Sequence, residues 1–441
     1  MQNLQRIAAV MAVLVLGLAA CSDSSSKIGG SVKGTRITIL DQSHKIEADH
    51  DLINTKPNLP AIEIVKAWPQ AGYGPTHMMP NAAVDIHPKV IWSSGIGSGS
   101  DSDFPLLARP VIGNGMLFTM DSEGLVRAFD ANNGDRKWEF DTAPPDRDGA
   151  AMGGGVGFDN GVLYATTGFG EVIALNAVDG KLIWRCPLLN PIRAAPAIAG
   201  GRVYAVSIDN ELQAIDVKTG KVEWHHRGIT ESATLLGASN PAITPDGVIV
   251  AYSSGEVFNL RPENGRVAWS YMLTVPTQIG AMPAIADIRG LPVVGNDRIY
   301  AISHSGRAAA IDQRTGDRVW EADVGSINTP VVAGDAMFVL SNDGQLVAIA
   351  NDSGRILWVK ELPQYTDPDD HDSDHILWAG PVMAANRLWL GNSQGQLVSF
   401  DAANGNQLDS IDLSDPINIP PIVVNNTMYV VLDSGRVVAL R

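Results

Sequence analysis

Short stretches in which apolar and polar residues alternate recur along most of the chain, and turns rich in glycine and asparagine separate them. One unit illustrates the pattern with four stretches: Ala195–Ile198, Val203–Ile208, Glu211–Val217 and Lys221–His225. Alternation with a period of two residues is typical of strands that have one buried face, and the intervening turns favour antiparallel pairing. The pattern therefore predicts a four-stranded antiparallel meander.

The last two predicted strands of this unit carry a motif that repeats, Ala-x-Asp/Asn-x-x-x-Gly-x-x-x-Trp. In the stretch Ala214–Trp224 the glycine, Gly220, stands four residues before the tryptophan, and a glycine or asparagine stands ten residues before that glycine. Asn259–Trp269 is a looser copy. The copies end at Trp138, Trp184, Trp224, Trp269, Trp320 and Trp358. A seventh copy keeps Gly405 but has Asp409 where the tryptophan is due.

Each unit begins with a proline or valine fourteen residues before the first glycine or asparagine of its motif. The eight starts are Pro110, Val156, Pro196, Pro241, Pro292, Pro330, Pro381 and Pro421. The last unit stops at Arg441 before a fourth strand, whereas Lys89–Trp92 is a tryptophan-bearing strand without a unit of its own. Pairing these two ends would remove an open sheet edge. We therefore predict an all-β, eight-bladed β-propeller of four-stranded antiparallel blades, closed by an N-terminal strand pairing with the C-terminal blade.

The repeated tryptophan has a structural explanation. A propeller blade cannot cover its own faces, so a large ring near its outer strand is well placed to fill the wedge between neighbouring blades. We assign this packing role to Trp92, Trp138, Trp184, Trp224, Trp269, Trp320 and Trp358.

The N-terminus has the pattern of a lipoprotein signal. Arg6 precedes an apolar run that ends at Ala20, and Leu18-Ala19-Ala20-Cys21 resembles a bacterial lipobox. We predict a signal peptide over 1–20, a lipidated Cys21 and a flexible tether over 21–34. The alternative is an ordinary signal peptide with a chance cysteine. An extension packed on the propeller is predicted over 35–85, and the propeller itself over 86–441.

The charge of the chain bears on which partners it can bind, and its cysteine content bears on whether it can form a disulfide. The formal net charge is −16, and 18% of residues are charged, which argues against a nucleic-acid surface that must neutralise phosphates. Apart from Cys21 the chain has only Cys186, so no disulfide can form within the mature protein.

No set of residues in the sequence has the pattern of a catalytic or metal site. The acidic loop 367–375 contains His371 and His375, but it lacks a recognisable ligand spacing, and a solvated loop is the default interpretation. The glycines at 153–155 are not followed by the Lys-Ser or Lys-Thr of a phosphate loop. We predict no catalytic residues, no metal and no cofactor.

The repeated motif resembles the pyrroloquinoline-quinone type propeller repeat over roughly residues 86–441, and two functions compete within that superfamily. Many quinone-dependent dehydrogenases carry an adjacent cysteine pair and calcium-binding acidic residues at the axis, and neither is evident here. The chain is also similar to the BamB family of lipoproteins in the outer-membrane β-barrel assembly machinery. The lipobox, the eight units and the stretch Trp92–Gly99 carry that resemblance.

The BamB resemblance implies a non-catalytic scaffold that is lipid-anchored in the outer membrane and faces the periplasm. Its implied partners are the periplasmic domains of BamA, other components of the machinery and unfolded outer-membrane proteins. Carried over residue by residue, the BamA-binding positions fall on Leu235 and Leu236 in one loop and on Asp287 and Arg289 in the next. Leu235 and Asp287 match the family, whereas Arg289 reverses a charge.

Other interpretations stay open from the sequence. The two leucines could belong to the core between blades, and Asp287 could cap a turn. The protein could also be a quinone-dependent periplasmic dehydrogenase or a degenerate relative, or a periplasmic propeller that binds a different protein.

Overall fold

The computed structural model describes residues 46–441 except 54, 148, 232–233, 274–285 and 371. The predicted signal peptide, Cys21, the tether and residues 35–45 of the predicted extension lie outside the described residues. Residues 46–441 form one compact unit.

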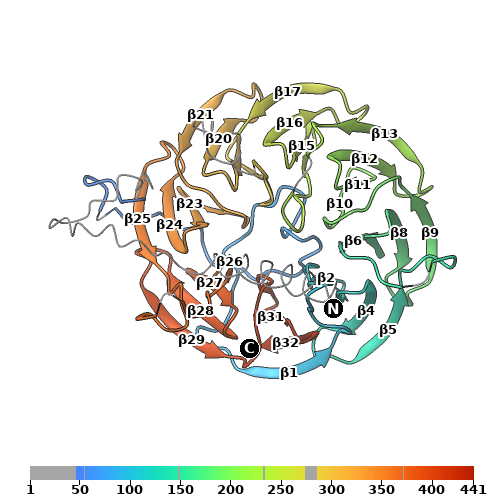
Figure 1. The fold of residues 1–441 in the computed structure, drawn as a ribbon, viewed down its shortest axis with the longest axis horizontal. Helices are drawn as coiled ribbons and strands as arrows, with labels where there is room; N and C mark the ends of the chain where they lie inside the picture. Colours follow the sequence, from blue (N-terminus) through green and yellow to red (C-terminus); the bar gives the residue numbers. More distant parts are fainter. Residues whose placement is uncertain (1–45, 54, 148, 232–233, 274–285, 371) are drawn as a thin grey trace, which may run out of the picture. The chain divides into compact units, whose positions relative to one another are not determined.

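The secondary structure of the described residues consists of strands, arranged as eight four-stranded antiparallel sheets around a central axis (Figure 1). From the inner to the outer strand, the first four blades are β2 (Val111–Gly113), β3 (Met116–Met120), β4 (Leu125–Asp130), β5 (Arg136–Asp141); β6 (Gly154–Asp159), β7 (Val162–Thr167), β8 (Glu171–Asn176), β9 (Leu182–Pro187); β10 (Ala197–Ala199), β11 (Arg202–Val206), β12 (Glu211–Asp216), β13 (Val222–Arg227); and β14 (Ala242–Thr244), β15 (Gly247–Ala251), β16 (Glu256–Leu260), β17 (Val267–Met272).

The other four blades follow the same order. They are β18 (Val293–Gly295), β19 (Arg298–Ile302), β20 (Ala308–Asp312), β21 (Arg318–Ala322); β22 (Val331–Ala333), β23 (Ala336–Leu340), β24 (Gln345–Ala350), β25 (Ile356–Glu361); β26 (Trp378–Ala384), β27 (Arg387–Asn392), β28 (Gln396–Asp401), β29 (Gln407–Asp412); and β30 (Ile422–Val424), β31 (Thr427–Leu432), β32 (Arg436–Leu440), β1 (Val90–Gly95). The predicted fold class is confirmed.

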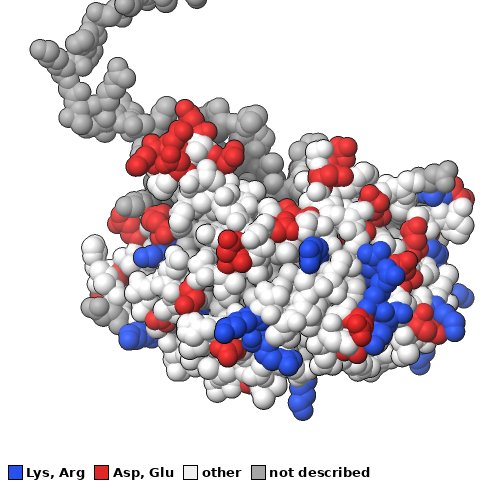
Figure 2. Space-filling model, turned by 90° about the horizontal axis from the view of Figure 1, so that it is seen from below, with Lys and Arg blue, Asp and Glu red and all other residues white. Residues whose placement is uncertain are grey.

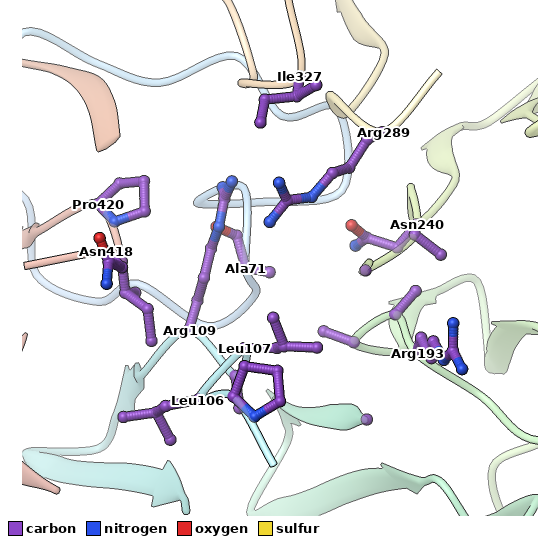
Figure 3. A pocket seen from close by; sticks show the side chains of 18 of the residues that line it. Ala71, Leu106, Leu107, Arg109, Arg193, Asn240, Arg289, Ile327, Asn418 and Pro420 are labelled. Atoms are coloured by element: carbon purple, nitrogen blue, oxygen red, sulfur yellow. The ribbon is translucent and has the colours of Figure 1, made fainter. Parts of the chain in front are cut away.

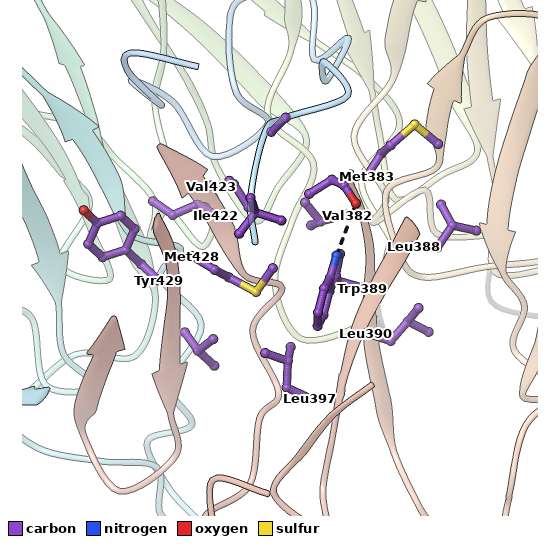
Figure 4. Packing of buried hydrophobic residues seen from close by; sticks show 14 of the residues in the cluster. Val382, Met383, Leu388, Trp389, Leu390, Leu397, Ile422, Val423, Met428 and Tyr429 are labelled. Carbon is purple, nitrogen blue, oxygen red and sulfur yellow. Dashed lines mark hydrogen bonds between the residues drawn. The ribbon is translucent and has the colours of Figure 1, made fainter. Parts of the chain in front are cut away.

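The eighth blade joins the two ends of the described chain, as predicted. β1 pairs antiparallel with β32, with Trp92 opposite Ala439. Just beyond this ladder, Lys89 and Arg441 exchange both of their backbone hydrogen bonds, at 2.8 and 2.9 Å. The neighbouring seam is tightly packed, because Trp389 of the seventh blade lies fully buried in the same hydrophobic cluster as Met428 of the eighth (Figure 4).

Each repeated tryptophan lies against the turn of the next blade. The indole nitrogen of Trp224 donates a hydrogen bond of 2.9 Å to the carbonyl of Pro262, and its ring covers Gly265. A β-carbon at Gly265, where φ is +70°, would lie 2.5 Å from that ring. The glycine is therefore required both for the turn and for the ring above it. The same ring-on-glycine contact recurs for Trp92, Trp138, Trp184, Trp269, Trp320 and Trp358, over Gly134, Gly180, Gly220, Gly316, Gly354 and Gly405.

Asp409 departs from this pattern for a geometric reason. The outer strand of the eighth blade is β1, which precedes all the other described strands in the sequence, so no turn joins it to β32. The eighth blade therefore has no turn glycine that an aromatic ring of the seventh blade could cover. Asp409 instead forms an ion pair with Arg387 and lies 3.5 Å from the ring nitrogen of His87. A polar contact thus replaces the aromatic one at the outer edge of the seventh blade.

The segment before β1 crosses the axis and pairs with the innermost strands. Trp68 and Ile112 exchange backbone hydrogen bonds of 2.8 Å. His77, further along the same segment, is fully buried. In five consecutive blades, the backbone amide two residues after the start of the unit donates a hydrogen bond of 2.7 to 3.0 Å to this segment. The donors are the amides of Ile112, Phe158, Ile198, Ile243 and Val294. The extension therefore satisfies an inner sheet edge that would otherwise be open.

Candidate functional site

A cavity of about 360 Å³ lies on the propeller axis, where loops lead into the innermost strands (Figure 3). Arg109, Arg193 and Arg289 reach it from the loops before β2, β10 and β18, and Asn240 from the loop before β14. Ala71 of the extension lines the cavity as well. The site is thus assembled from several blades and from the segment that crosses the axis.

Two of the arginines, Arg109 and Arg289, lie close enough for their charges to interact, and Asp287 is the acidic side chain whose charge acts on Arg289. The Arg109 guanidinium donates hydrogen bonds of 3.3 Å to the carbonyl of Ala71 and 3.4 Å to the hydroxyl of Thr329. Burial, with a further contribution from the charge of Arg289, lowers the pKa of Arg109 to about 10. Burial also lowers the pKa of Arg289, although Asp287 opposes that shift. Within the part of the chain that the structure describes, no ion pair to a carboxylate is found for Arg109, Arg193 or Arg289.

The carboxylates of the cavity have partners elsewhere. Asp433 accepts hydrogen bonds from the side chains of Ser100, at 3.2 Å, and Asn418, at 2.6 Å, and burial raises its pKa. Asp101 accepts hydrogen bonds from the backbone amides of Asp103 and Phe104 in its own turn. These carboxylates are therefore engaged by hydrogen-bond donors other than the three arginines.

The four partner-binding positions proposed from the sequence lie beside this cavity, in two adjacent loops. Leu236 is 45% exposed and Leu235 is half-buried, whereas Asp287 is only 4% exposed. A carboxylate oxygen of Asp287 accepts a hydrogen bond of 2.8 Å from the amide of Leu235, so it ties the two loops together. Burial raises the pKa of Asp287, and this hydrogen bond opposes the shift.

Arg289 and Gly237 bring the same two loops into close contact. A β-carbon at Gly237, where φ is +90°, would lie 2.9 Å from the Nε atom of Arg289. The two loops therefore meet at the arginine cavity, which both Gly237 and Arg289 line. Of the four proposed residues, the structure directs Leu236 outward and Arg289 into the cavity.

Arg109, Arg193 and Asn240 were not identified from the sequence, although a signal was present. Arg109 and Asn240 stand immediately before the unit starts Pro110 and Pro241, and Arg193 stands three residues before Pro196. Arg289 has that same spacing from Pro292. In a propeller each of these positions leads into an innermost strand, so basic and amide residues there would converge on the axis.

The other candidates examined in the sequence have ordinary surroundings. Residues 367–370, 372 and 374 of the acidic loop are exposed, and the ring of His375 lies against Tyr365, while His371 lies outside the described residues. Cys186 is buried, and burial raises the pKa of its thiol. Among the described residues there is no group of three or more His, Cys, Asp or Glu side chains that could hold a metal ion.

Acidic and basic side chains are unevenly distributed over the visible face in Figure 2. Asp and Glu cluster on projections at the upper rim, and Lys and Arg are more frequent along the flank below. Separately, none of the described segments forms a helix long and apolar enough to span a bilayer.

Comparison with known proteins gives a family match and solved structures of similar fold. A family model described as outer membrane protein assembly factor BamB matches residues 122–360 and 367–441. The chain is 27% identical over 368 residues to the outer membrane protein assembly factor BamB of Yersinia pestis, covering 82% of this chain and 91% of that one.

Two solved structures are similar in fold. The crystal structure of BamB from Moraxella catarrhalis matches with a TM-score of 0.67 and 20% identity, covering 80% of this chain and 100% of that chain. Quinohemoprotein alcohol dehydrogenase from Comamonas testosteroni matches with a TM-score of 0.64 and 14% identity, covering 89% and 82%. At these identities both matches show the shared architecture alone.

Proposed function

The chain belongs to the family of outer membrane protein assembly factor BamB, and from this premise we propose that it is a non-catalytic scaffold in the assembly of outer-membrane proteins. In this proposal Cys21 carries a lipid anchor, and the propeller faces the periplasm from the outer membrane. Its direct partner is a periplasmic domain of BamA, alongside other components of the assembly machinery. Unfolded outer-membrane proteins are its proposed clients.

The observation that carries the proposal is the surface formed by residues 235–236. An exposed leucine beside a half-buried one offers an apolar contact, and covering such side chains with a partner is favourable because it removes apolar surface from water. Asp287 contributes from beneath, because its hydrogen bond to the Leu235 amide fixes the loop that presents both leucines. We therefore assign direct contact to the leucines and a positioning role to Asp287.

Co-purification from membranes tests the partner. We expect the double variant Leu235→Ala and Leu236→Ala to recover markedly less BamA than the wild type. The matched control is Leu182→Ala with Ile183→Ala, which removes two leucine-sized side chains that are 46% and 50% exposed on the outer strand β9. Equal recovery by both double variants, with both folded, would contradict the assignment of this surface.

Spectroscopy of the purified protein tests the non-catalytic part of the proposal. A quinone-dependent dehydrogenase shows quinone absorbance and reduces an electron-accepting dye when substrate is added. We expect neither signal, including after incubation with pyrroloquinoline quinone and Ca²⁺. Dye reduction with an alcohol substrate would instead support the dehydrogenase alternative.

A further inference from the structure

We propose that the axial cavity is a binding site for a small polycarboxylate, held between the guanidinium groups of Arg109 and Arg289. This inference goes beyond the scaffold function and does not depend on it. The argument rests on the position of the two arginines, on the absence of a direct ion pair between either of them and a carboxylate of the described residues, and on the size of the cavity.

The first observation is the convergence of positive charge. Arg109 and Arg289 come from loops of different blades, yet Figure 3 shows their guanidinium groups side by side at the centre of the cavity. Like charges in a partly dehydrated site repel one another more strongly than in water. An anion between them would relieve that repulsion, and no carboxylate among the described residues forms an ion pair with either.

The second observation is that hydrogen bonds hold the side chain of Arg109 without an anion and that the side chain of Arg289 is packed against a neighbouring loop. Arg109 is hydrogen-bonded to Ala71 of the extension and to Thr329, and the side chain of Arg289 passes close to the backbone at Gly237. A ligand would therefore meet donors whose freedom is already restricted, which reduces the entropy lost on binding. Planar guanidinium groups match carboxylates, because two parallel N–H donors reach two oxygens.

The third observation is the shape and lining of the cavity. Its volume of about 360 Å³ falls in the range of small-molecule sites. Leu107 and Ile327 supply apolar surface next to the arginines, and Arg193 lines the cavity on the side away from Asn418. Because Asp101 and Asp433 lie in the lining too, the site favours a compact ligand whose carboxylates all reach the arginines. These features indicate a short-chain dicarboxylate or tricarboxylate.

Titration calorimetry on the full-length protein in detergent, with citrate and succinate as probes, tests the proposal. We expect saturable binding of citrate in sodium chloride of matched ionic strength, and an upward shift in melting temperature as citrate is added. Replacing both arginines, Arg109→Gln with Arg289→Gln, should weaken citrate binding at least about tenfold, because both charged forks are lost.

The control carries the same change in net charge outside the cavity. Arg261→Gln with Arg266→Gln alters two exposed arginines in the turn between β16 and β17, and we expect citrate binding to stay at the wild-type level. If the cavity double variant does not fold, Gly237→Ala provides a second test. Its β-carbon would displace Arg289 and should lower citrate affinity while both arginines remain.

Three results would overturn the proposal. The first is an absence of saturable citrate and succinate binding by the wild type. The second is equal citrate affinity in the wild type and in the folded cavity variant. The third is tighter binding of inorganic phosphate than of either carboxylate, which would reject the ligand class.

Discussion

At the scale of single residues, His77 is a buried base that the fold keeps neutral. Its Nδ1 lies 2.8 Å from the carbonyl of Pro292, which can only accept, so Nδ1 carries the hydrogen. Nε2 lies 3.5 Å from the side-chain nitrogen Nδ2 of Asn240, which can only donate, so Nε2 is the acceptor. Burial lowers the pKa of His77 to about 4, and the nearby charge of Arg109 adds to that shift.

This environment predicts a loss of stability in mild acid. Below about pH 6.5 His77 becomes protonated in the unfolded chain, whereas in the folded protein it stays neutral down to about pH 4. Stability from this group is therefore complete above pH 6.5 and falls as the pH drops towards 4, by roughly 3 kcal/mol in total. Urea midpoints measured across this range for the wild type and His77→Gln should show a shallower pH dependence in the variant. Parallel curves would contradict the prediction.

The residue scale also shows what sequence reasoning can and cannot reach. The spacing of Gly220 and Trp224 predicts a turn and a packed ring, because both depend on local geometry. The partner of each ring, the turn glycine of the following blade, depends on how blades stack. The replacement of tryptophan by Asp409 is explained only once the eighth blade is seen to lack that turn. Likewise, the role of Asp287 follows only from the structure, in which its carboxylate accepts a hydrogen bond from the amide of Leu235.

At the scale of elements, the extension behaves as an additional partner for the inner strands. It binds the inner strands mostly through backbone hydrogen bonds, but at the third blade a side chain forms the corresponding hydrogen bonds. Gln70 accepts a hydrogen bond of 3.0 Å from the amide of Ile198 and donates one of 2.8 Å to its carbonyl. The carboxamide of Gln70 thus replaces a peptide unit in the ladder.

Removing this carboxamide should destabilise the protein and expose one amide. Gln70→Ala leaves the buried amide and carbonyl of Ile198 without partners, at a cost of about 1–3 kcal/mol for each unsatisfied group. Hydrogen exchange should accelerate at Ile198. The amide of Ile112, which Trp68 holds through its backbone, serves as the internal control. Unchanged exchange at Ile198 would contradict the assignment of its protection to the Gln70 carboxamide.

The sequence indicates these strands far better than it indicates the path of the extension. Strand and turn positions follow from alternation and from glycines with positive φ, such as Gly220 at +65°. Residues 46–85 lack such a period, and the bonds of Trp68, Gln70 and His77 reach blades that are distant in sequence. The axial cavity was missed for the same reason, since its arginines converge only when the ring closes.

At the scale of the whole molecule, the circle is closed without a covalent link between its last two strands. In the other seven blades a turn connects the third strand to the fourth, whereas β1 is held to β32 by strand pairing and by the ring of Trp92. Trp92 packs on Gly134 of the first blade and lies 5.9 Å, between ring centroids, from Tyr429 of the eighth. This one side chain therefore joins three parts of the closing seam.

Local opening should accordingly begin at this seam. Separating β1 from β32 frees a strand with no turn to restrain it, so the entropy gained on opening is larger than for β13 leaving β12. We expect the amides of β1 and β32 to exchange together, and faster than those of β12 and β13 in the third blade. Trp92→Ala should widen this difference, because it removes a ring worth about 3–5 kcal/mol when buried, less here because Trp92 is only half-buried. Equal protection of the two pairs, with no selective effect of Trp92→Ala, would mean that the ring opens as one cooperative unit.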